Sequence, residues 1–127
     1  MIGIGTDLVD LDRFREVLLR TPTIVDRLFT SGEQRYAQTK ADPTERFGVR
    51  FAAKEAAMKA LGLGLGAVRF RDIEVVRAES GVPSLVLHGQ AAEIAFSFGV
   101  NRWLLTLSHT DHVAQAVAVA LGQEGPM

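Results

Sequence analysis

The chain has 127 residues, with 14 Lys and Arg against 15 Asp and Glu, a formal net charge of -1 and no cysteine. A chain of this length buries about two-thirds of its unfolded surface, so one domain spanning residues 1–127 can fold without a disulfide or structural metal. The missing cysteine excludes thiol catalysis and Cys-ligated zinc, and the near-zero charge gives no general attraction to nucleic acid or to a membrane.

The N-terminal segment IGIGTDLV, residues 2–9, predicts a buried strand. Its Ile and Gly residues alternate, so the glycine side could let another backbone or a ligand come close, and Asp7 is expected near the strand end. No signal-peptide pattern is present at the start, and no apolar run reaches about 18 residues. The sequence therefore predicts a soluble, unexported protein, which we place in the cytoplasm.

A helical region is predicted to follow from about Asp10. Leu11, Phe14 and Leu18 recur at i, i+3 and i+7, as on one buried face of a helix. At Thr21-Pro22 the helix should restart, with threonine as the N-cap and proline at the first helical position.

Two more helices are predicted before the middle of the chain. Thr30 and Glu33 have the spacing of a capping box and open a short helix. The longest helix should open at Asp42, before a proline, and run to Leu61. It should stop where LGLGLG, residues 61–66, supplies glycines that can take left-handed conformations.

The second half of the chain predicts two hairpins separated by a helix. DIEVVR and SLVLHG flank turn residues 79–83, and a helix is expected from Gln90 to Gly99. RWLLTLS and VAQAVAVAL flank a polar turn, and although alanine would also suit a helix, the valines favour a strand. The expected order is β-α-α-α-β-β-α-β-β, a single α+β domain.

Both faces of the last predicted strand are apolar. The valine side holds Val113, Val117, Val119 and Leu121, and the other side holds four alanines at positions 114–120. Such a strand is either covered on both sides within the monomer or uses its flat alanine face against another subunit. The pattern leaves both alternatives open.

Several apparent motifs do not survive their spacing. In GIGTDL the third glycine of a dinucleotide fingerprint would fall on Leu8. LGLGLG lacks the ending of a P-loop, so helix termination is favoured, with backbone contact to a ligand as the alternative. The residues of SHTDH, 108–112, are too close together to converge as a triad. His109 is either solvent-exposed or a donor to a phosphate.

The longest predicted helix carries two rows of charge. Arg46, Arg50 and Lys54 form one i, i+4 row, and Glu55 and Lys59 form another about 100° away. The plain interpretation is a solvated face, where such a pair contributes only a few tenths of a kcal/mol.

A metal and phosphate site is the alternative interpretation. The alanines around Glu55 would leave room beside its carboxylate. Because Mg²⁺ takes one or two carboxylates and completes its shell with water and phosphate, Asp7 and Glu55 would suit it. Arg50, Lys54 and Lys59 would then offset the charge of phosphates.

Five segments taken together resemble a known family: GIGTDLVDLDRF, FTSGE, RFAAKEAAMKALGLGLG, DIEV followed by GVP, and LTLSHT. They are similar, in order and over most of the chain, to holo-[acyl-carrier-protein] synthase, the short bacterial 4'-phosphopantetheinyl transferase. The resemblance implies a small antiparallel sheet wrapped on a long helix. It also implies a Mg²⁺-dependent transfer of phosphopantetheine from coenzyme A to a serine of apo acyl carrier protein, in support of fatty acid biosynthesis, with release of adenosine 3',5'-bisphosphate.

The resemblance also assigns residues of this chain. Asp7 and Glu55 match the Mg²⁺ ligands. Glu55, directly or through a metal-held water, is the candidate acceptor of the serine proton, and Lys59 and Lys54 support the phosphates. Residues that match the coenzyme A site are Arg50, Lys54, Lys59, Gly64, His109 and Thr110. Because the segment KADPTER, 40–46, is shorter or less basic than in relatives, Lys40 and Arg46 are not assigned.

Partners follow from the same resemblance. The acidic carrier protein is expected on the first helical region, at Arg13, Arg20, Ile24, Arg27 and Leu28. A departure there is a threonine at position 23, where the family often has a basic residue. The family assembles as a homotrimer with active sites at subunit boundaries, which favours an interface role for the alanine face of the last strand.

Two rival functions remain open at this point. The first is a non-catalytic module that binds a carrier protein or nucleotide, although a pure binder has no need of the carboxylates of Asp7 and Glu55. The second is a structural trimer whose charged helix is only a solvated face. Metal-independent binding without product would favour the binding module. A lack of any coenzyme A binding would favour the structural trimer.

Overall fold

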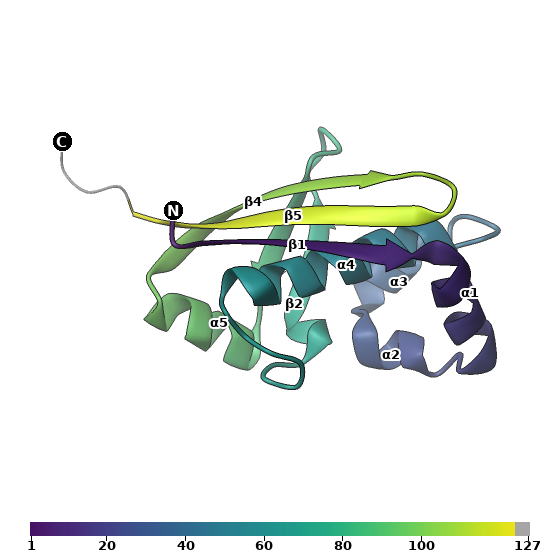
Figure 1. Ribbon diagram of the computed structural model, residues 1–127, viewed down its shortest axis with the longest axis horizontal. Helices are drawn as coiled ribbons and strands as arrows, with labels where there is room; N and C mark the ends of the chain where they lie inside the picture. The colour runs from purple at the N-terminus through teal and green to yellow at the C-terminus, as the bar shows by residue number, and fades with distance from the viewer. Residues whose placement is uncertain (124–127) are drawn as a thin grey trace.

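In the computed structural model, which describes residues 1–123, the long helix α4 lies against one face of a three-stranded sheet (Figure 1). The elements are β1 Gly3–Asp10, α1 Leu11–Arg20, α2 Ile24–Leu28, α3 Ser31–Ala37, α4 Thr44–Ala60, a 3₁₀ turn η1 Phe70–Asp72, β2 Ile73–Arg77, β3 Pro83–Leu87, α5 Gly89–Ser97, β4 Val100–His109 and β5 Val113–Gly122. The α+β fold, with a small antiparallel sheet on a long helix, is confirmed.

The main sheet has the strand order β1-β5-β4, and all its pairs are antiparallel. Strand β5 lies between the first strand of the chain and its hairpin partner β4, so the two ends of the chain meet in one sheet (Figure 1). The second sheet is the predicted hairpin of β2 and β3. Both predicted hairpins and the helix between them are confirmed.

Close packing between β1 and α4 depends on the glycines of the N-terminal strand. A Cβ atom on Gly5 would overlap the carbonyl oxygen of Ala56, and one on Gly3 would overlap that of Ala60. The predicted close approach of another backbone is therefore confirmed, and the backbone belongs to α4. Ala56 is fully buried, as are Ala52, Ala53 and Ala57. The alanines of α4 thus serve core packing.

Asp7 lies inside β1, opposite Ala116, and not at the strand end, because β1 continues to Asp10. Side chains alternate along a strand, so Asp7 shares the helix-facing side of β1 with Gly3 and Gly5. The predicted burial of the whole strand is wrong. On the outer side, Ile4 is 58% exposed and Leu8 is 65% exposed.

The alanine face of β5 is completely buried within the chain. Ala114, Ala116, Ala118 and Ala120 have no exposed surface and belong to the core with the alanines of α4. The interface role predicted for this face is wrong, because small side chains on both surfaces let the helix and the sheet approach closely. The outer face of the sheet is the exposed one, and Leu104 of β4 adds to its apolar surface.

The helix start predicted from capping residues is confirmed for α3, whereas the starts predicted at Thr21 and Asp42 differ from the structure. The capping box of Thr30 and Glu33 is present at the start of α3. Thr21 is not an N-cap, because its N–H bonds to the carbonyl of Val17 and ends α1. The predicted restart of the helix is a separate five-residue helix, α2, which begins only at Ile24. Four α-helices therefore lie between β1 and β2, whereas the expected order had three. Helix α4 begins at Thr44, whose N–H donates to the Asp42 carboxylate.

No helix within residues 1–123 is long and apolar enough to cross a membrane. The glycines after α4 behave as predicted, since Gly62 and Gly66 take positive φ values of 71° and 86°.

Candidate functional site

The helix-facing side of β1 brings Asp7 to the charged row of α4 that holds Glu55 and Lys59. The ammonium of Lys59 donates to Oδ1 of Asp7 at 2.9 Å and to the carbonyl oxygen of Thr6 at 3.1 Å. Asp7 and Lys59, 52 positions apart in the sequence, are therefore in contact, and Glu55 adjoins Asp7. We call Asp7, Glu55 and Lys59 the carboxylate cluster. The sequence prediction that joined Asp7 to the KEA segment agrees with this geometry.

Within the carboxylate cluster, the titration of Glu55 is shifted towards neutral pH. Burial and the adjacent Asp7 carboxylate together raise the pKa of Glu55 to about 7, and the charge of Lys59 offsets only part of this rise. The hydrogen bond to Asp7 raises the pKa of Lys59, so its ammonium stays charged. A carboxyl group poised near neutrality can hold or release a proton under physiological conditions, as a general base requires.

The donor set of the cluster fits Mg²⁺. Two carboxylates this close repel each other when both are ionised, and a bound cation removes that repulsion. Within residues 1–123 no group of three or more His, Cys, Asp or Glu side chains could hold a metal ion. Such a two-carboxylate site suits Mg²⁺, which keeps waters and takes substrate oxygens, better than a metal that needs an all-protein cage.

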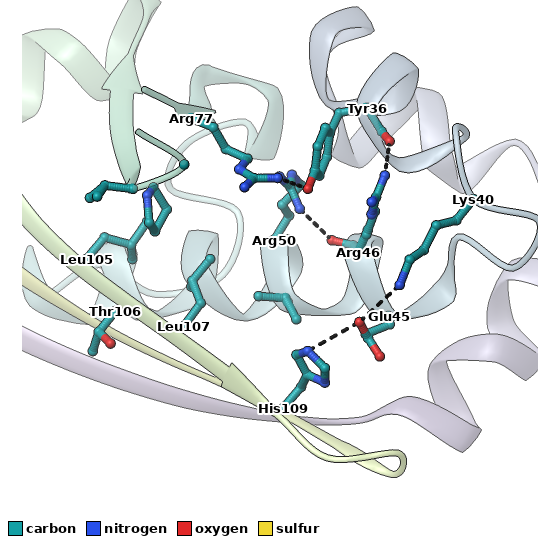
Figure 2. Close-up of a pocket in the computed structure, with 14 residues that line it drawn as sticks. Tyr36, Lys40, Glu45, Arg46, Arg50, Arg77, Leu105, Thr106, Leu107 and His109 are labelled. Carbon is teal, nitrogen blue, oxygen red and sulfur yellow. Dashed lines mark hydrogen bonds and ion pairs between the residues drawn. The ribbon is translucent and has the colours of Figure 1, made fainter. Parts of the chain in front are cut away.

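A second feature is a cavity of about 580 Å³ between α3, the first half of α4, the β2–β3 hairpin and β4 (Figure 2). We call it the cationic cavity because basic side chains dominate its polar lining: Lys40, Arg46, Arg50, Arg77 and His109. Its apolar wall includes Val49, Leu105 and Leu107. No residue of the carboxylate cluster lines it.

Three guanidinium groups surround the ring of Tyr36 in the cationic cavity. The Cζ atoms of Arg46, Arg50 and Arg77 lie 4.2, 4.4 and 4.8 Å from the ring centroid. Arg46 also donates to the backbone carbonyl of Tyr36 at 2.7 Å, and Arg77 bonds to the Tyr36 hydroxyl (Figure 2). The aromatic face attracts each cation, so Tyr36 holds together three like charges that repel one another.

The three arginines lack a carboxylate partner within 4 Å among residues 1–123. Arg50 is only 5% exposed, and its Nε is the one buried side-chain nitrogen or oxygen in that part of the chain without a hydrogen-bond partner. A buried, unpaired charged donor is costly. The arrangement therefore fits a ligand that brings its own negative charge, such as a phosphate ester.

Lys54 does not take part in either site, although the sequence analysis placed it in the coenzyme A site. Its side chain is 0% exposed, and its ammonium bonds to Glu33 at 2.8 Å and to the carbonyls of Phe70 at 3.0 Å and Ile73 at 2.6 Å. All three donors are used in the core, so the predicted phosphate contact of Lys54 is wrong. Helical spacing placed Lys54 in one row with Arg46 and Arg50, but it could not show that Lys54 is buried in the core.

The remaining residues predicted for the coenzyme A site lie apart. Arg50 and His109 line the cationic cavity, whereas Lys59 belongs to the carboxylate cluster. Gly64 is in the exposed loop after α4, where an added Cβ atom would meet no other atom within 4 Å. The hydroxyl of Thr110 accepts hydrogen bonds from His112 and Val113 and shapes the β4–β5 turn.

Sequence reasoning missed two members of the cationic cavity and left two more unassigned. Tyr36 and Arg77 come from α3 and β2, and no spacing in the sequence connects them. Lys40 and Arg46, which were left unassigned, also line the cavity. The i, i+4 relation of Arg46 to Arg50 was the one available signal for Arg46.

A third feature is a cavity of about 730 Å³ between α2 and the segment before β2. Its lining combines apolar and basic side chains: Ile24, Arg27, Leu28, Val68, Arg69, Phe70 and Arg71, together with Asp26 and Gly66. We call this surface the α2 groove. Of the predicted carrier-binding residues, Ile24, Arg27 and Leu28 line it, whereas Arg13 and Arg20 are exposed on α1 outside it.

Comparison with known proteins agrees with these features. The sequence model of the 4'-phosphopantetheinyl transferase superfamily, ACPS, matches residues 3–118. Holo-[acyl-carrier-protein] synthase of Koribacter versatilis is 43% identical over 121 residues, which are 94% of this chain and 97% of that protein.

Solved structures give the same result. Holo-[acyl-carrier-protein] synthase of Neisseria meningitidis superposes with a TM-score of 0.87 at 32% identity, covering 95% of this chain and 99% of that one. The Helicobacter pylori holo-[acyl-carrier-protein] synthase in complex with coenzyme A has a TM-score of 0.82 at 27% identity, covering 93% of this chain and 99% of that one. The chain described here therefore belongs to the 4'-phosphopantetheinyl transferase superfamily, with the holo-[acyl-carrier-protein] synthases as its relatives.

Proposed function

We propose that this protein transfers the 4'-phosphopantetheine arm of coenzyme A to a serine of an apo acyl carrier protein, in support of fatty acid biosynthesis. The observation that carries the proposal is the meeting of Asp7, Glu55 and Lys59 from β1 and α4. The relatives act on acyl carrier protein by name, and the Helicobacter pylori relative binds coenzyme A. The cytoplasmic location stays a prediction from the sequence.

Asp7 and Glu55 are the residues that would hold Mg²⁺. When bound, the ion supplies positive charge that offsets the negative charge of the pyrophosphate oxygens. Lys59 adds a fixed ammonium beside the same carboxylates, and its raised pKa keeps it charged through neutral pH. Two kinds of positive charge, one from the side chain and one from the ion, then face the reacting phosphates.

The chemistry is an attack by the serine hydroxyl oxygen on the β-phosphorus of coenzyme A. A new P–O bond forms to the serine, and the bond from the β-phosphorus to the bridging oxygen breaks. The bridging oxygen leaves on adenosine 3',5'-bisphosphate. Glu55 takes the serine proton, directly or through a water held at the site.

We assign the nucleotide end of coenzyme A to the cationic cavity. Its three unpaired guanidiniums and His109 provide charge for the phosphates of that end. Because the carboxylate cluster does not line this cavity, a complete site combines the cluster of one subunit with the cavity of its neighbour. The exposed apolar side chains of Ile4, Leu8 and Leu104 on the outer face of the sheet support an assembly, which we propose to be a homotrimer.

The acidic carrier protein is assigned to the α2 groove and to the adjacent α1. Arg27, Arg69 and Arg71 surround an apolar floor there, a combination that suits an acidic helix with apolar side chains. Arg69 and Arg71 extend the surface predicted from the sequence. Arg71 is oriented by its bond to the backbone carbonyl of Asp26 at 2.6 Å.

The transfer is tested by incubating the protein with apo acyl carrier protein, coenzyme A and Mg²⁺ and measuring the intact mass of the carrier. The carrier is expected to gain one phosphopantetheine, and omission of Mg²⁺ or addition of a chelator should prevent the gain. If coenzyme A binds but no carrier is modified, the protein is a binding module and the proposed transfer is wrong.

Sharing of the site between subunits predicts complementation between two defective variants. Glu55→Gln has a defective carboxylate cluster and an intact cationic cavity. The double variant Arg77→Ala, His109→Ala has an intact cluster and a defective cavity. Random co-assembly should restore about one quarter of the wild-type rate at coenzyme A concentrations below the wild-type KM, since each intact site needs one good part from each of two subunits. The rate is measured on co-expressed proteins, with separately purified and unmixed variants as controls. A co-expressed sample no more active than the unmixed variants would place both parts of the site in one chain.

A further inference from the structure

The cationic cavity contains one acidic side chain among its described lining residues, Glu45. Its Oε1 lies 3.3 Å from Nε2 of His109 and 3.7 Å from Nζ of Lys40. Figure 2 shows Glu45 between these two side chains, while Arg46, Arg50 and Arg77 gather around Tyr36. The basic lining is thus divided into three arginines without a carboxylate and two basic side chains that already share one.

The position of Glu45 is fixed by its helix. Glu45 is in the first turn of α4, where a negative side chain is favoured by the helix dipole. Lys40 comes from the loop before this helix, and His109 is the last residue of β4. The carboxylate therefore holds together two basic side chains from separate parts of the fold.

We infer that Glu45 is an internal counter-ion that weakens binding of coenzyme A by occupying Lys40 and His109 in the free protein. The inference rests on the proposed assignment of the nucleotide end of coenzyme A to this cavity. A phosphate that contacts Lys40 or His109 must separate that side chain from Glu45, and Glu45 then remains as a negative charge beside the ligand. Glu45 thereby sets the affinity for the nucleotide and eases release of the bisphosphate product.

The test is calorimetric titration of coenzyme A into Glu45→Gln. Glutamine keeps the size of the side chain but removes its charge. All three side chains are partly exposed, so each contact contributes modestly, and the Kd is expected to fall by about threefold to tenfold. In steady-state assays the KM for coenzyme A should fall by a similar factor, while kcat does not rise.

Glu93→Gln is the matched control, because Glu93 is exposed on α5 and does not line the cavity. It makes the same change in net charge, so an equal gain in affinity there would mean general electrostatic attraction and would overturn the inference. Glu45→Asp keeps the charge in the first turn of α4 but shortens its reach, and its Kd should lie between those of wild type and Glu45→Gln. This second variant keeps the test valid if Glu45→Gln folds poorly.

An unchanged or higher Kd in Glu45→Gln overturns the inference, since Glu45 would then position Lys40 and His109 for the ligand or contact it directly. The double variant Arg77→Ala, His109→Ala separates this failure from failure of the site assignment. If that variant binds coenzyme A as wild type does, the cavity is not the nucleotide site. If it binds less tightly while Glu45→Gln shows no gain, only the role of Glu45 is wrong.

Discussion

Replacement of Glu55 by glutamine is expected to lower kcat by at least about a hundredfold, because it removes a proton acceptor and a carboxylate ligand for Mg²⁺ at once. The amide cannot take the serine proton and is a weaker ligand for a hard cation. The rate is measured as the gain in intact mass of the carrier protein with time. Glu93→Gln, which changes an exposed residue of α5 outside the carboxylate cluster, should keep wild-type activity.

The fold of Glu55→Gln should be intact, and above neutral pH it should be at least as stable as wild type. In the unfolded chain Glu55 loses its proton near the ordinary value of 4.5, whereas the folded protein retains it to about 7. Between these values the unfolded state binds fewer protons, so rising pH lowers the stability of the wild-type protein. Glutamine carries no charge and removes this loss. Thermal melts without metal at pH 5 and pH 8 measure the difference.

Normal turnover by Glu55→Gln would refute both roles assigned to this side chain. A variant that is inactive because it is unfolded would be recognised by its melting curve. Loss of activity with an unchanged or raised melting temperature therefore identifies Glu55 as a functional residue whose charge the fold tolerates at a cost in stability.

Local sequence signals were sufficient for most of the fold. The capping box of Thr30 and Glu33 placed α3, and the alternation of β5 placed both of its faces. What the alternation did not show was which face the chain itself would cover. Alanines of β5 meet alanines of α4 and glycines of β1, and this fit depends on three separate segments, so it became visible only in the structure.

The candidate site was predictable only in part, for a similar reason. Asp7 and Glu55 were joined first as carboxylates suited to Mg²⁺ and then by the resemblance, and the structure brings both to one cluster. Tyr36 and Arg77 could not be found, because the cationic cavity combines α3, α4, β2 and β4 without a linear motif. Helical spacing set Arg50 and Lys54 in one row, yet it did not show that Arg50 lines the cavity whereas Lys54 is buried in the core.

Lys54 is the residue for which the sequence prediction, a phosphate contact, and the structure, a buried ion pair, differ most. We expect Lys54→Met to destabilise the protein by about 3–5 kcal/mol, because it leaves the carboxylate of Glu33 buried without its cation. Glu33 also accepts from the N–H groups of Thr30 and Val75, so the carboxylate anchors α3 to β2 as well as to α4. Urea unfolding measures the change in the free energy of unfolding.

Lys59→Met is the matched control, because it makes the same chemical change on the same helix. The side chain of Lys59 is largely exposed, so its ion pair with Asp7 should contribute no more than about 1 kcal/mol to stability. Its loss should instead lower the rate of transfer. The two lysines, five residues apart, are thus expected to give opposite results, one in stability and the other in catalysis.

Combining Lys54→Met with Glu33→Gln tests the cause of the destabilisation. The neutral amide needs no counter-ion and its oxygen still accepts a hydrogen bond, so the double variant should be more stable than Lys54→Met alone. A Lys54→Met protein as stable as wild type but with weakened coenzyme A binding would contradict the core role. It would return Lys54 to the coenzyme A site that the resemblance implied.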